Sequence, residues 1–260
     1  MYAMLASHYK GQLPDHYFIE PKIDGVRVHI FANAKKGEVE FLSRNMNEFK
    51  SLNYLKPAVL SLIANTIGDI ILDGEVVAGT VQQTIASVFS ENRGLVAKIY
   101  LFDVIKPDIT LLERRMWMQN HLLFNNDIQL IPVFNKNGNV DETYKEARSL
   151  GYEGIVIKDT LSEYECGERS DAWQKLKPSK DVDLMVVGWK EGKVAETIGA
   201  LQVVFNGKRC WVGSGFTEPQ RRSLWEIRDE LIGWIVEVQY QEITKAGAMR
   251  HPTFVRIRLD

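Results

Sequence analysis

Hydrophobic and polar residues alternate in several short stretches of the first two thirds of the chain. Residues 25–32 are the clearest case, because apolar side chains at even positions from Val26 to Ile30 would share one face of a strand. Similar patterns predict strands at residues 16–20, 38–43, 69–78, 97–105, 128–134, 153–158 and 173–177. Helical spacing instead predicts helices at residues 52–64, 81–89, 110–124 and 141–150.

The pattern changes after the stretch at residues 178–181. Five strand-like runs follow, at residues 182–189, 200–205, 209–212, 235–241 and 254–259. One helix interrupts them at residues 217–232, where Thr217 and Gln220 form a capping-box pattern. Short strands with a single helix favour a small β-barrel of the OB type. We therefore predict an α+β protein with antiparallel sheets and flanking helices in residues 1–178 and an OB-fold barrel in residues 179–260.

The composition narrows the classes of protein to which this chain could belong. Hydrophobic residues make up 45% of the 260 residues and charged residues 25%, which is typical of a globular protein with a core. The net charge of −2 gives no general attraction to nucleic acid, so any such surface must be local. The two cysteines, Cys166 and Cys210, lie in no metal-ligand spacing. Without a secretory signal or a run of transmembrane length, the sequence predicts a cytoplasmic protein and no membrane partner.

Ionisable residues crowd around one lysine near the start of the chain. Lys22 follows Glu20 by two residues and precedes Asp24-Gly25 and Arg27. An ordinary lysine has a pKa near 10.4, so a nucleophilic Lys22 would need desolvation, cationic neighbours or a metal. Three later lysines near predicted strand ends could supply that charge: Lys158, Lys175 and Lys177. The alternative, that these lysines are solvated surface charges, stays open from the residues alone.

Carboxylates interrupt two predicted apolar strands, in Asp73-Gly74-Glu75 and in Glu153-Gly154. A buried carboxylate is costly without a partner, so these groups should face a cavity, a metal or a cation. Magnesium prefers one or two carboxylates together with phosphate oxygens. A turn at Asp73-Gly74 and ordinary salt bridges are the alternatives. Phe102 could stack on a base or pack in the core.

The order of these motifs along the chain resembles one family. The segments are Lys22-Ile23-Asp24-Gly25-Val26-Arg27, Ser43-Arg44-Asn45, Asp73-Gly74-Glu75, Phe102-Asp103, Glu153 to Lys158, Trp173 to Lys177 and Arg250 to Asp260. Together they resemble the ATP-dependent DNA ligases of the covalent nucleotidyltransferase superfamily, in outline the short phage and bacterial forms. The resemblance covers nearly the whole chain.

The resemblance implies nick sealing in double-stranded DNA through a lysyl-AMP on Lys22, by a monomer that uses ATP and Mg²⁺ or Mn²⁺. Glu20 would read the adenine amino group, Phe102 would stack on the base, and Lys175 and Lys177 would assist catalysis. Glu75 and Glu153 would hold the metal. The full set of implied nucleotide contacts is Glu20, Ile23, Arg27, Arg44, Glu75, Phe102, Lys158, Arg256 and Arg258, with Asp260 beside the last two.

The chain also departs from larger members of the family. Few residues precede Lys22, so we expect no N-terminal DNA-binding domain. One helix fills residues 207–233, so we expect no long insertion that could encircle DNA. The family's final motif usually has a lysine after the aspartate, whereas this sequence stops at Asp260. These features predict modest, salt-sensitive binding to nicked duplex.

Two other functions stay in view. An RNA-directed relative, either a capping guanylyltransferase or an RNA ligase, would share the Lys22 motif. The segments Gly199-Ala200-Leu201-Gln202 and Val212 to Thr217 instead resemble DNA ligases. A non-catalytic OB protein would need exposed aromatic platforms for single strands. The tryptophans here fall in apolar runs and are expected in the core: Trp189, Trp211, Trp225 and Trp234.

Overall fold

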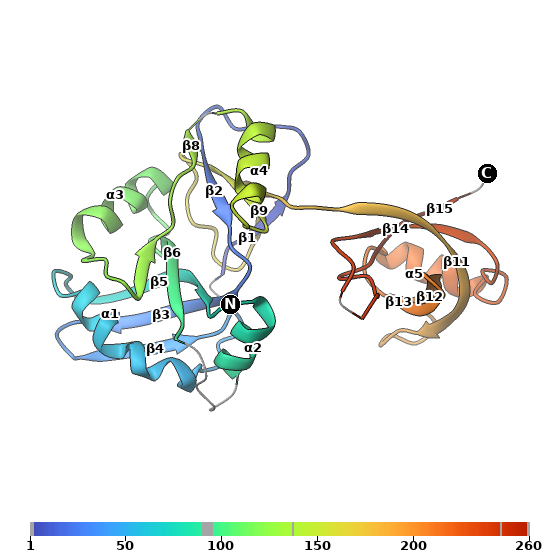
Figure 1. The fold of residues 1–260 in the computed structure, drawn as a ribbon, viewed down its shortest axis with the longest axis horizontal. Coiled ribbons are helices and arrows are strands. Elements are labelled where there is room, and N and C mark those ends of the chain that lie inside the picture. Colours follow the sequence, from blue (N-terminus) through green and yellow to red (C-terminus); the bar gives the residue numbers. More distant parts are fainter. Residues whose placement is uncertain (1–2, 90–95, 137, 245, 259–260) are drawn as a thin grey trace. The chain divides into compact units, whose positions relative to one another are not determined.

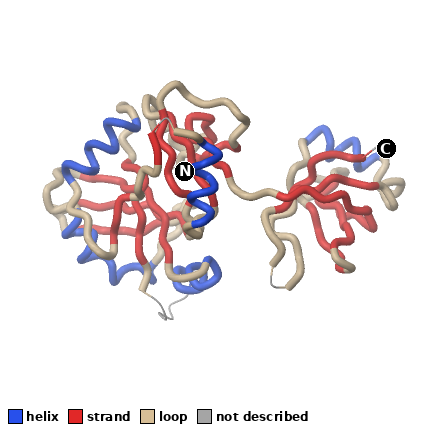
Figure 2. Tube along the Cα trace, turned by 45° about the horizontal axis from the view of Figure 1, so that its top comes forward, coloured by secondary structure: helices blue, strands red, loops and turns tan. Residues whose placement is uncertain are grey.

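The computed structural model describes residues 3–89, 96–136, 138–244 and 246–258. The chain divides into two compact units, Met1–Leu176 and Lys177–Asp260 (Figure 1). Strands make up much of both units (Figure 2). None of the described helices is both long enough and apolar enough to cross a membrane.

One five-stranded sheet of the first unit carries Lys22. Its order is β1-β10-β9-β2-β8, with a parallel β1–β10 pair and antiparallel pairs elsewhere. The strands are β1 (Leu5–His8), β2 (Tyr17–Lys22), β8 (Asn135–Lys136), β9 (Gly154–Asp159) and β10 (Arg169–Leu176). Helix α4 (Val140–Ser149) packs Val140 and Ala147 against Ile155 and Ile157 of β9.

A second five-stranded sheet in the same unit has the order β4-β3-β5-β6-β7. Its strands are β3 (Val26–Asn33), β4 (Glu38–Leu42), β5 (Asp69–Val77), β6 (Lys98–Val104) and β7 (Ile128–Leu130). The helices of this part are η1 (Lys50–Leu55), α1 (Lys56–Leu62), α2 (Val81–Phe89) and α3 (Leu111–His121). Even positions of β3, such as Val28 and Ile30, join the main core, as the alternation predicted.

The second unit contains one antiparallel sheet with the order β13-β12-β11-β14-β15. A bridge between Ser214 and Thr253 connects the end of β13 to β15. Its elements are β11 (Lys180–Glu191), β12 (Ile198–Phe205), β13 (Lys208–Val212), α5 (Glu218–Glu226), β14 (Ile235–Tyr240) and β15 (Thr253–Arg258). Thr217 and Gln220 form the capping box that the sequence predicted for α5.

Several local predictions were wrong. Strand β1 was not predicted, because its four residues are too few for alternation to be recognised. Helix α5 ends at Glu226 rather than at residue 232, and the following residues form turns up to Gly233, whose φ is +93°. Strand β11 already begins at Lys180, so the connection is shorter than residues 178–181. The predicted helix at 52–64 is η1 followed by α1, and the predicted strand at 128–134 ends at Leu130.

Trp211 was expected in the core but is 43% exposed. It lies on β13, at the edge of the sheet, and Lys190 of β11 lies 5.0 Å from its ring centroid. The other three tryptophans of this unit, Trp189, Trp225 and Trp234, pack against its core as expected.

Candidate active site

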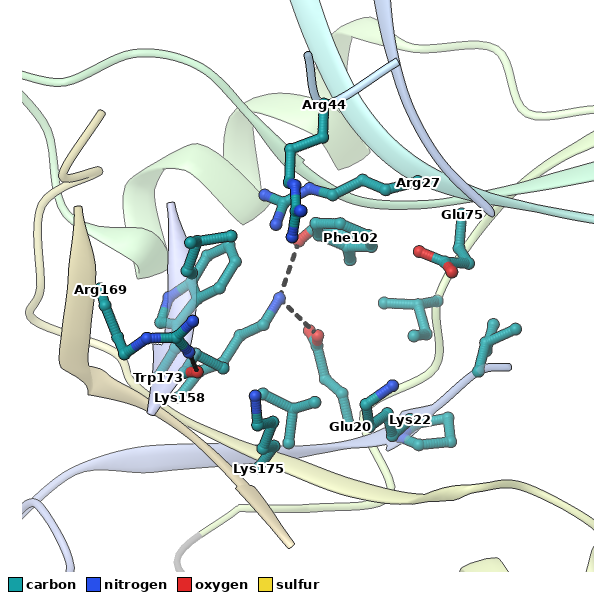
Figure 3. Close-up of a pocket in the computed structure, with 16 residues that line it drawn as sticks. Glu20, Lys22, Arg27, Arg44, Glu75, Phe102, Lys158, Arg169, Trp173 and Lys175 are labelled. Carbon is teal, nitrogen blue, oxygen red and sulfur yellow. Dashed lines mark hydrogen bonds and ion pairs between the residues drawn. The ribbon is translucent and has the colours of Figure 1, made fainter. Parts of the chain in front are cut away.

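A cavity of about 270 Å³ lies between the two sheets of the first unit (Figure 3). Strands β2, β3, β5, β6, β9 and β10 all contribute side chains to it. Nine predicted site residues line this one cavity: Glu20, Lys22, Ile23, Arg27, Arg44, Glu75, Phe102, Lys158 and Lys175.

Lys22 is the last residue of β2, where it pairs with Gly154 of β9. Its backbone carbonyl accepts a 2.9 Å hydrogen bond from the amide of Glu153. This pairing brings the two side chains together, and Lys22 Nζ contacts Glu153 Oε2. The side chain of Lys22 is 25% exposed, so the amine is partly desolvated while still reachable from solvent. Glu153 thus lies directly beside the lysine.

Glu75 of β5 provides a second carboxylate in the cavity. Burial raises the pKa of Glu75 to about 7, even though Lys22 and Arg27 favour its charged form and Glu153 opposes it. The described residues contain no group of three or more metal-ligating side chains. Magnesium usually takes one or two carboxylates and completes its coordination with phosphate oxygens and water. Glu75 and Glu153 therefore fit a metal that arrives with a nucleotide.

Arg27 is fixed by a buried network behind the cavity. Its Nε and Nη2 donate to the two carboxylate oxygens of Asp73 at 2.9 and 2.5 Å, and its Nη1 donates to the Met4 carbonyl at 2.7 Å. The Tyr164 hydroxyl donates to Asp73 at 2.6 Å. Although burial opposes ionisation, Arg27 and His29 keep the pKa of Asp73 below its ordinary value. A bidentate pair of this kind holds the guanidinium in one orientation.

Phe102 forms part of the cavity wall and meets Trp173 edge to face, with ring centroids 6.0 Å apart. Lys158 Nζ lies 4.8 Å from the Phe102 ring centroid and 4.1 Å from that of Trp173. The guanidinium carbon of Arg27 lies 5.3 Å from the Phe102 centroid, so two cations and one aromatic ring surround Phe102 at the cavity wall.

Glu20 is almost fully buried and held by two cations. Its Oε1 accepts from Arg115 Nη1 at 2.6 Å, and its Oε2 lies 2.7 Å from Lys158 Nζ. Lys158 also donates to the Phe102 carbonyl at 3.2 Å (Figure 3). The sequence did not indicate Arg115, which reaches this wall from α3. Its only signal was a charged pair, Arg114-Arg115, inside a predicted helix.

The remaining predicted residues lie elsewhere. Lys177 follows β10 directly and is not among the described residues that line the cavity. Arg256 and Arg258 belong to β15 of the second unit, where they pair with Glu237 and Asp183. Asp260 falls outside the described residues. Arg169 and Trp173 are among the cavity residues that the sequence did not single out as ligand contacts.

Two family models match the chain. A family model for the ATP-dependent DNA ligase domain matches residues 3–177. The chain belongs to the ATP-dependent DNA ligase family. A second model, for the DNA ligase OB-like domain, matches residues 191–258 of this ligase-family chain.

The relatives of this ligase-family chain include longer proteins. A DNA ligase of Methanothrix thermoacetophila is 29% identical over 290 residues, covering 93% of this chain and 52% of that protein. A DNA ligase of Haloquadratum walsbyi is 31% identical, covering 95% of this chain and 47% of that protein. The chain thus spans about half the length of the curated relatives it matches.

Solved structures show the same fold. One called Pmar-Lig_PreS3 has a TM-score of 0.79 at 27% identity and covers 99% of this chain and 67% of its own. A structure from a study of DNA binding by Lig E DNA ligases has a TM-score of 0.73 at 23% identity, with 98% of both chains covered. The predicted combination of an α+β catalytic part with an OB-type domain is therefore confirmed.

Proposed function

We propose that this chain is the catalytic core of an ATP-dependent DNA ligase, which seals nicks in duplex DNA through a covalent AMP on Lys22. One observation carries the proposal. Lys22, Glu75 and Phe102 line one partly open cavity, and the carboxylate of Glu153 contacts Lys22 there, although the four residues come from separate strands or strand ends. Family membership of residues 3–177 supports it.

In the first step, Lys22 Nζ attacks the α-phosphorus of ATP. A nitrogen–phosphorus bond forms, the bond to the β-phosphate oxygen breaks, and pyrophosphate leaves. Catalysis of such in-line displacement is mainly positioning and charge neutralisation. Phe102 provides the base platform and Lys175 adds positive charge at the cavity wall.

Lys22 must lose a proton before it attacks, because only the free lone pair is nucleophilic. The carboxylate of Glu153 touches Nζ and is therefore placed to hold that proton. Glu75 and Glu153 would also hold Mg²⁺ or Mn²⁺, which supplies positive charge to the phosphate oxygens. The sequence prediction assigned the activation of Lys22 to metal together with Lys175 and Lys177, and that stays a prediction.

The later steps act on DNA. The 5′-phosphate at the nick attacks the AMP phosphorus and the nitrogen–phosphorus bond breaks, which restores Lys22. The 3′-hydroxyl then attacks the activated 5′-phosphate, the strand is joined and AMP leaves. Arg44 is exposed at the mouth of the cavity, where a phosphate could reach it. The contributions of Lys177, Arg256 and Arg258, the monomeric state and the cytoplasmic location stay predictions.

Covalent labelling tests the first step. Incubation with α-labelled ATP and Mg²⁺ should give an acid-labile adduct on the protein, and Lys22→Ala should abolish it. Lys36→Ala, a change at an exposed lysine, is the matched control and should leave labelling unchanged. Label that persists in Lys22→Ala would refute the assignment of the nucleophile.

Discharge of the adduct tests the substrate. Nicked duplex DNA should release the label as AMP and yield a sealed strand, whereas intact duplex should not. Faster labelling by GTP than by ATP, or sealing only of RNA nicks, would favour the RNA-directed alternatives instead.

A further inference from the structure

The wall of the nucleotide cavity is tied together by a residue that does not line it. Arg115 of α3 donates from Nη1 to Glu20 Oε1 at 2.6 Å and from Nη2 to the Ile131 carbonyl at 2.5 Å. Glu20 and Ile131 both line the cavity, whereas Arg115 lies behind them with 8% of its side chain exposed. The planar guanidinium of Arg115 therefore links α3 both to β2 and to Ile131, the residue that follows β7.

The second cation on Glu20 comes from the neighbouring strand β9 and approaches the other carboxylate oxygen. Lys158 of β9 is buried, with 3% of its side chain exposed, and lies 2.7 Å from Glu20 Oε2. It is also held by the Phe102 carbonyl and by the rings of Phe102 and Trp173. Its ammonium is therefore engaged with the base platform and Glu20. This placement suits a residue that orients the cavity wall better than one that contacts the phosphate chain.

We propose that Arg115, acting together with Lys158, is a positioning residue that sets the base selectivity of the cavity by fixing the carboxylate of Glu20. The inference rests on the proposed function and on the role that the family resemblance implies for Glu20, which is to read the base of ATP. A carboxylate offers only acceptor lone pairs. Fixed in one place, it accepts a hydrogen bond from the 6-amino group of adenine and repels the 6-oxo group of hypoxanthine or guanine.

The fork of Arg115 matters because its two donors reach two different wall elements at once. A lysine has a single ammonium on a flexible stem and cannot reproduce that planar arrangement. An unclamped Glu20 could turn away from a mismatched base, so it would reject a 6-oxo purine less strongly. Sites built around a fixed hydrogen bond discriminate far better than sites that merely enclose a base.

The neighbouring arginine supplies a matched control. Arg114 is equally buried, but its Nε and Nη2 donate to Asp103 at 2.8 and 3.0 Å and its Nη1 to the Ile109 carbonyl at 2.7 Å. Arg114 and Asp103 do not line the cavity. Arg114→Lys should therefore lower thermal stability without altering base selectivity.

The experiment measures kcat/KM for covalent labelling of Lys22 with ATP, with inosine triphosphate and with the triphosphate of unsubstituted purine riboside. In Arg115→Met, the ATP-to-inosine ratio should fall about tenfold or more, and Arg115→Lys should fall between Arg115→Met and wild type. KM for ATP should rise, while the labelling rate at saturating ATP changes less. Purine riboside triphosphate, which has no 6-substituent, should show the smallest change.

Three outcomes are decisive. No adduct with ATP on the wild-type protein would refute the proposed function rather than this inference. An adduct whose ATP-to-inosine ratio is unchanged in both Arg115→Lys and Arg115→Met would overturn the inference. An equal fall of the ratio in Arg114→Lys would also overturn it, because selectivity would then follow general stability. If Arg115→Met does not fold, Arg115→Lys decides the question alone.

Discussion

The arginines of the two units are paired in different ways. In the first unit, Arg114 with Asp103 and Arg115 with Glu20 are ion pairs almost closed to solvent. In the second unit, the side chain of Arg256 is 60% exposed and pairs with Glu237. Arg258 pairs with the same glutamate and also with Asp183. In both units these arginines have carboxylate partners, but burial of the pairs in the first unit costs far more desolvation free energy.

Burial explains what each arrangement can do. A buried pair must offset the desolvation of both charges, so removal of one partner is severe and the geometry is fixed. An exposed pair is screened and contributes little, so its members can exchange one partner for another. The first arrangement suits a cavity that must hold a base in one orientation. The second suits arginines that exchange a carboxylate for a phosphate.

The largest effect is expected from Arg114→Met, which leaves Asp103 buried without its partner. We expect a loss of about 3–5 kcal/mol in the free energy of unfolding, measured by urea denaturation at pH 8. Burial already raises the pKa of Asp103 above its ordinary value, despite Arg114. Without the arginine it rises further, so protonation relieves the cost and the loss should be smaller at pH 5.

The exposed Arg258 provides the control, since Arg258→Met should cost about 1 kcal/mol or less. Equal losses in the two variants would remove the distinction between the units.

The next largest effect is expected from Glu75→Gln, which should raise the free energy of unfolding rather than lower it. The pKa of Glu75, about 7 in the folded protein, exceeds the ordinary value of 4.5, mainly because of burial. The wild-type protein therefore loses stability as pH rises through this range, and Glu75→Gln does not. In metal-free buffer the variant should be more stable by about 3 kcal/mol at pH 8 and equal to wild type at pH 4.5.

The same variant should label poorly with ATP, which separates stability from activity. Addition of Mg²⁺ should reduce the stability difference at pH 8, since a cation favours the charged carboxylate. A difference that is the same at both pH values would show that Glu75 does not titrate in this range.

Added salt should weaken the contacts with DNA phosphates and leave the buried ion pairs almost unchanged. If two phosphates are neutralised, nick binding should weaken about tenfold between 50 and 200 mM salt. Sealing at subsaturating DNA should fall in parallel, while covalent labelling with ATP should change little. Tight binding to intact duplex that does not respond to salt would contradict this prediction.

The smallest effect is expected from Glu237→Gln, which removes the carboxylate shared by Arg256 and Arg258. Stability should change by about 1 kcal/mol or less. If these arginines contact ATP as predicted, KM for ATP in the labelling assay should fall about twofold, because they lose a competing anion. A large loss of stability would instead make this pair a structural element of β15.

The sequence could predict those features that depend on spacing along the chain. The alternation around Val28 and the capping box at Thr217 correspond to an observed strand and an observed helix start. The sequence did not predict β1, which has only four residues, and it placed the end of α5 too far along the chain. Pairing with distant strands, which no local pattern records, decides such elements.

The ordered motifs, from residues 20–27 to the end of the chain, made Lys22 the candidate nucleophile and a nucleotide its expected partner. Only the tertiary structure showed that Glu153 touches this lysine and that Asp73 and Tyr164 hold Arg27. Only the structure brought Arg115 to Glu20, across 95 positions of sequence. The physical reason is that a motif fixes which groups are present, whereas the desolvation and pairing that set their chemistry arise when strands far apart in the chain meet.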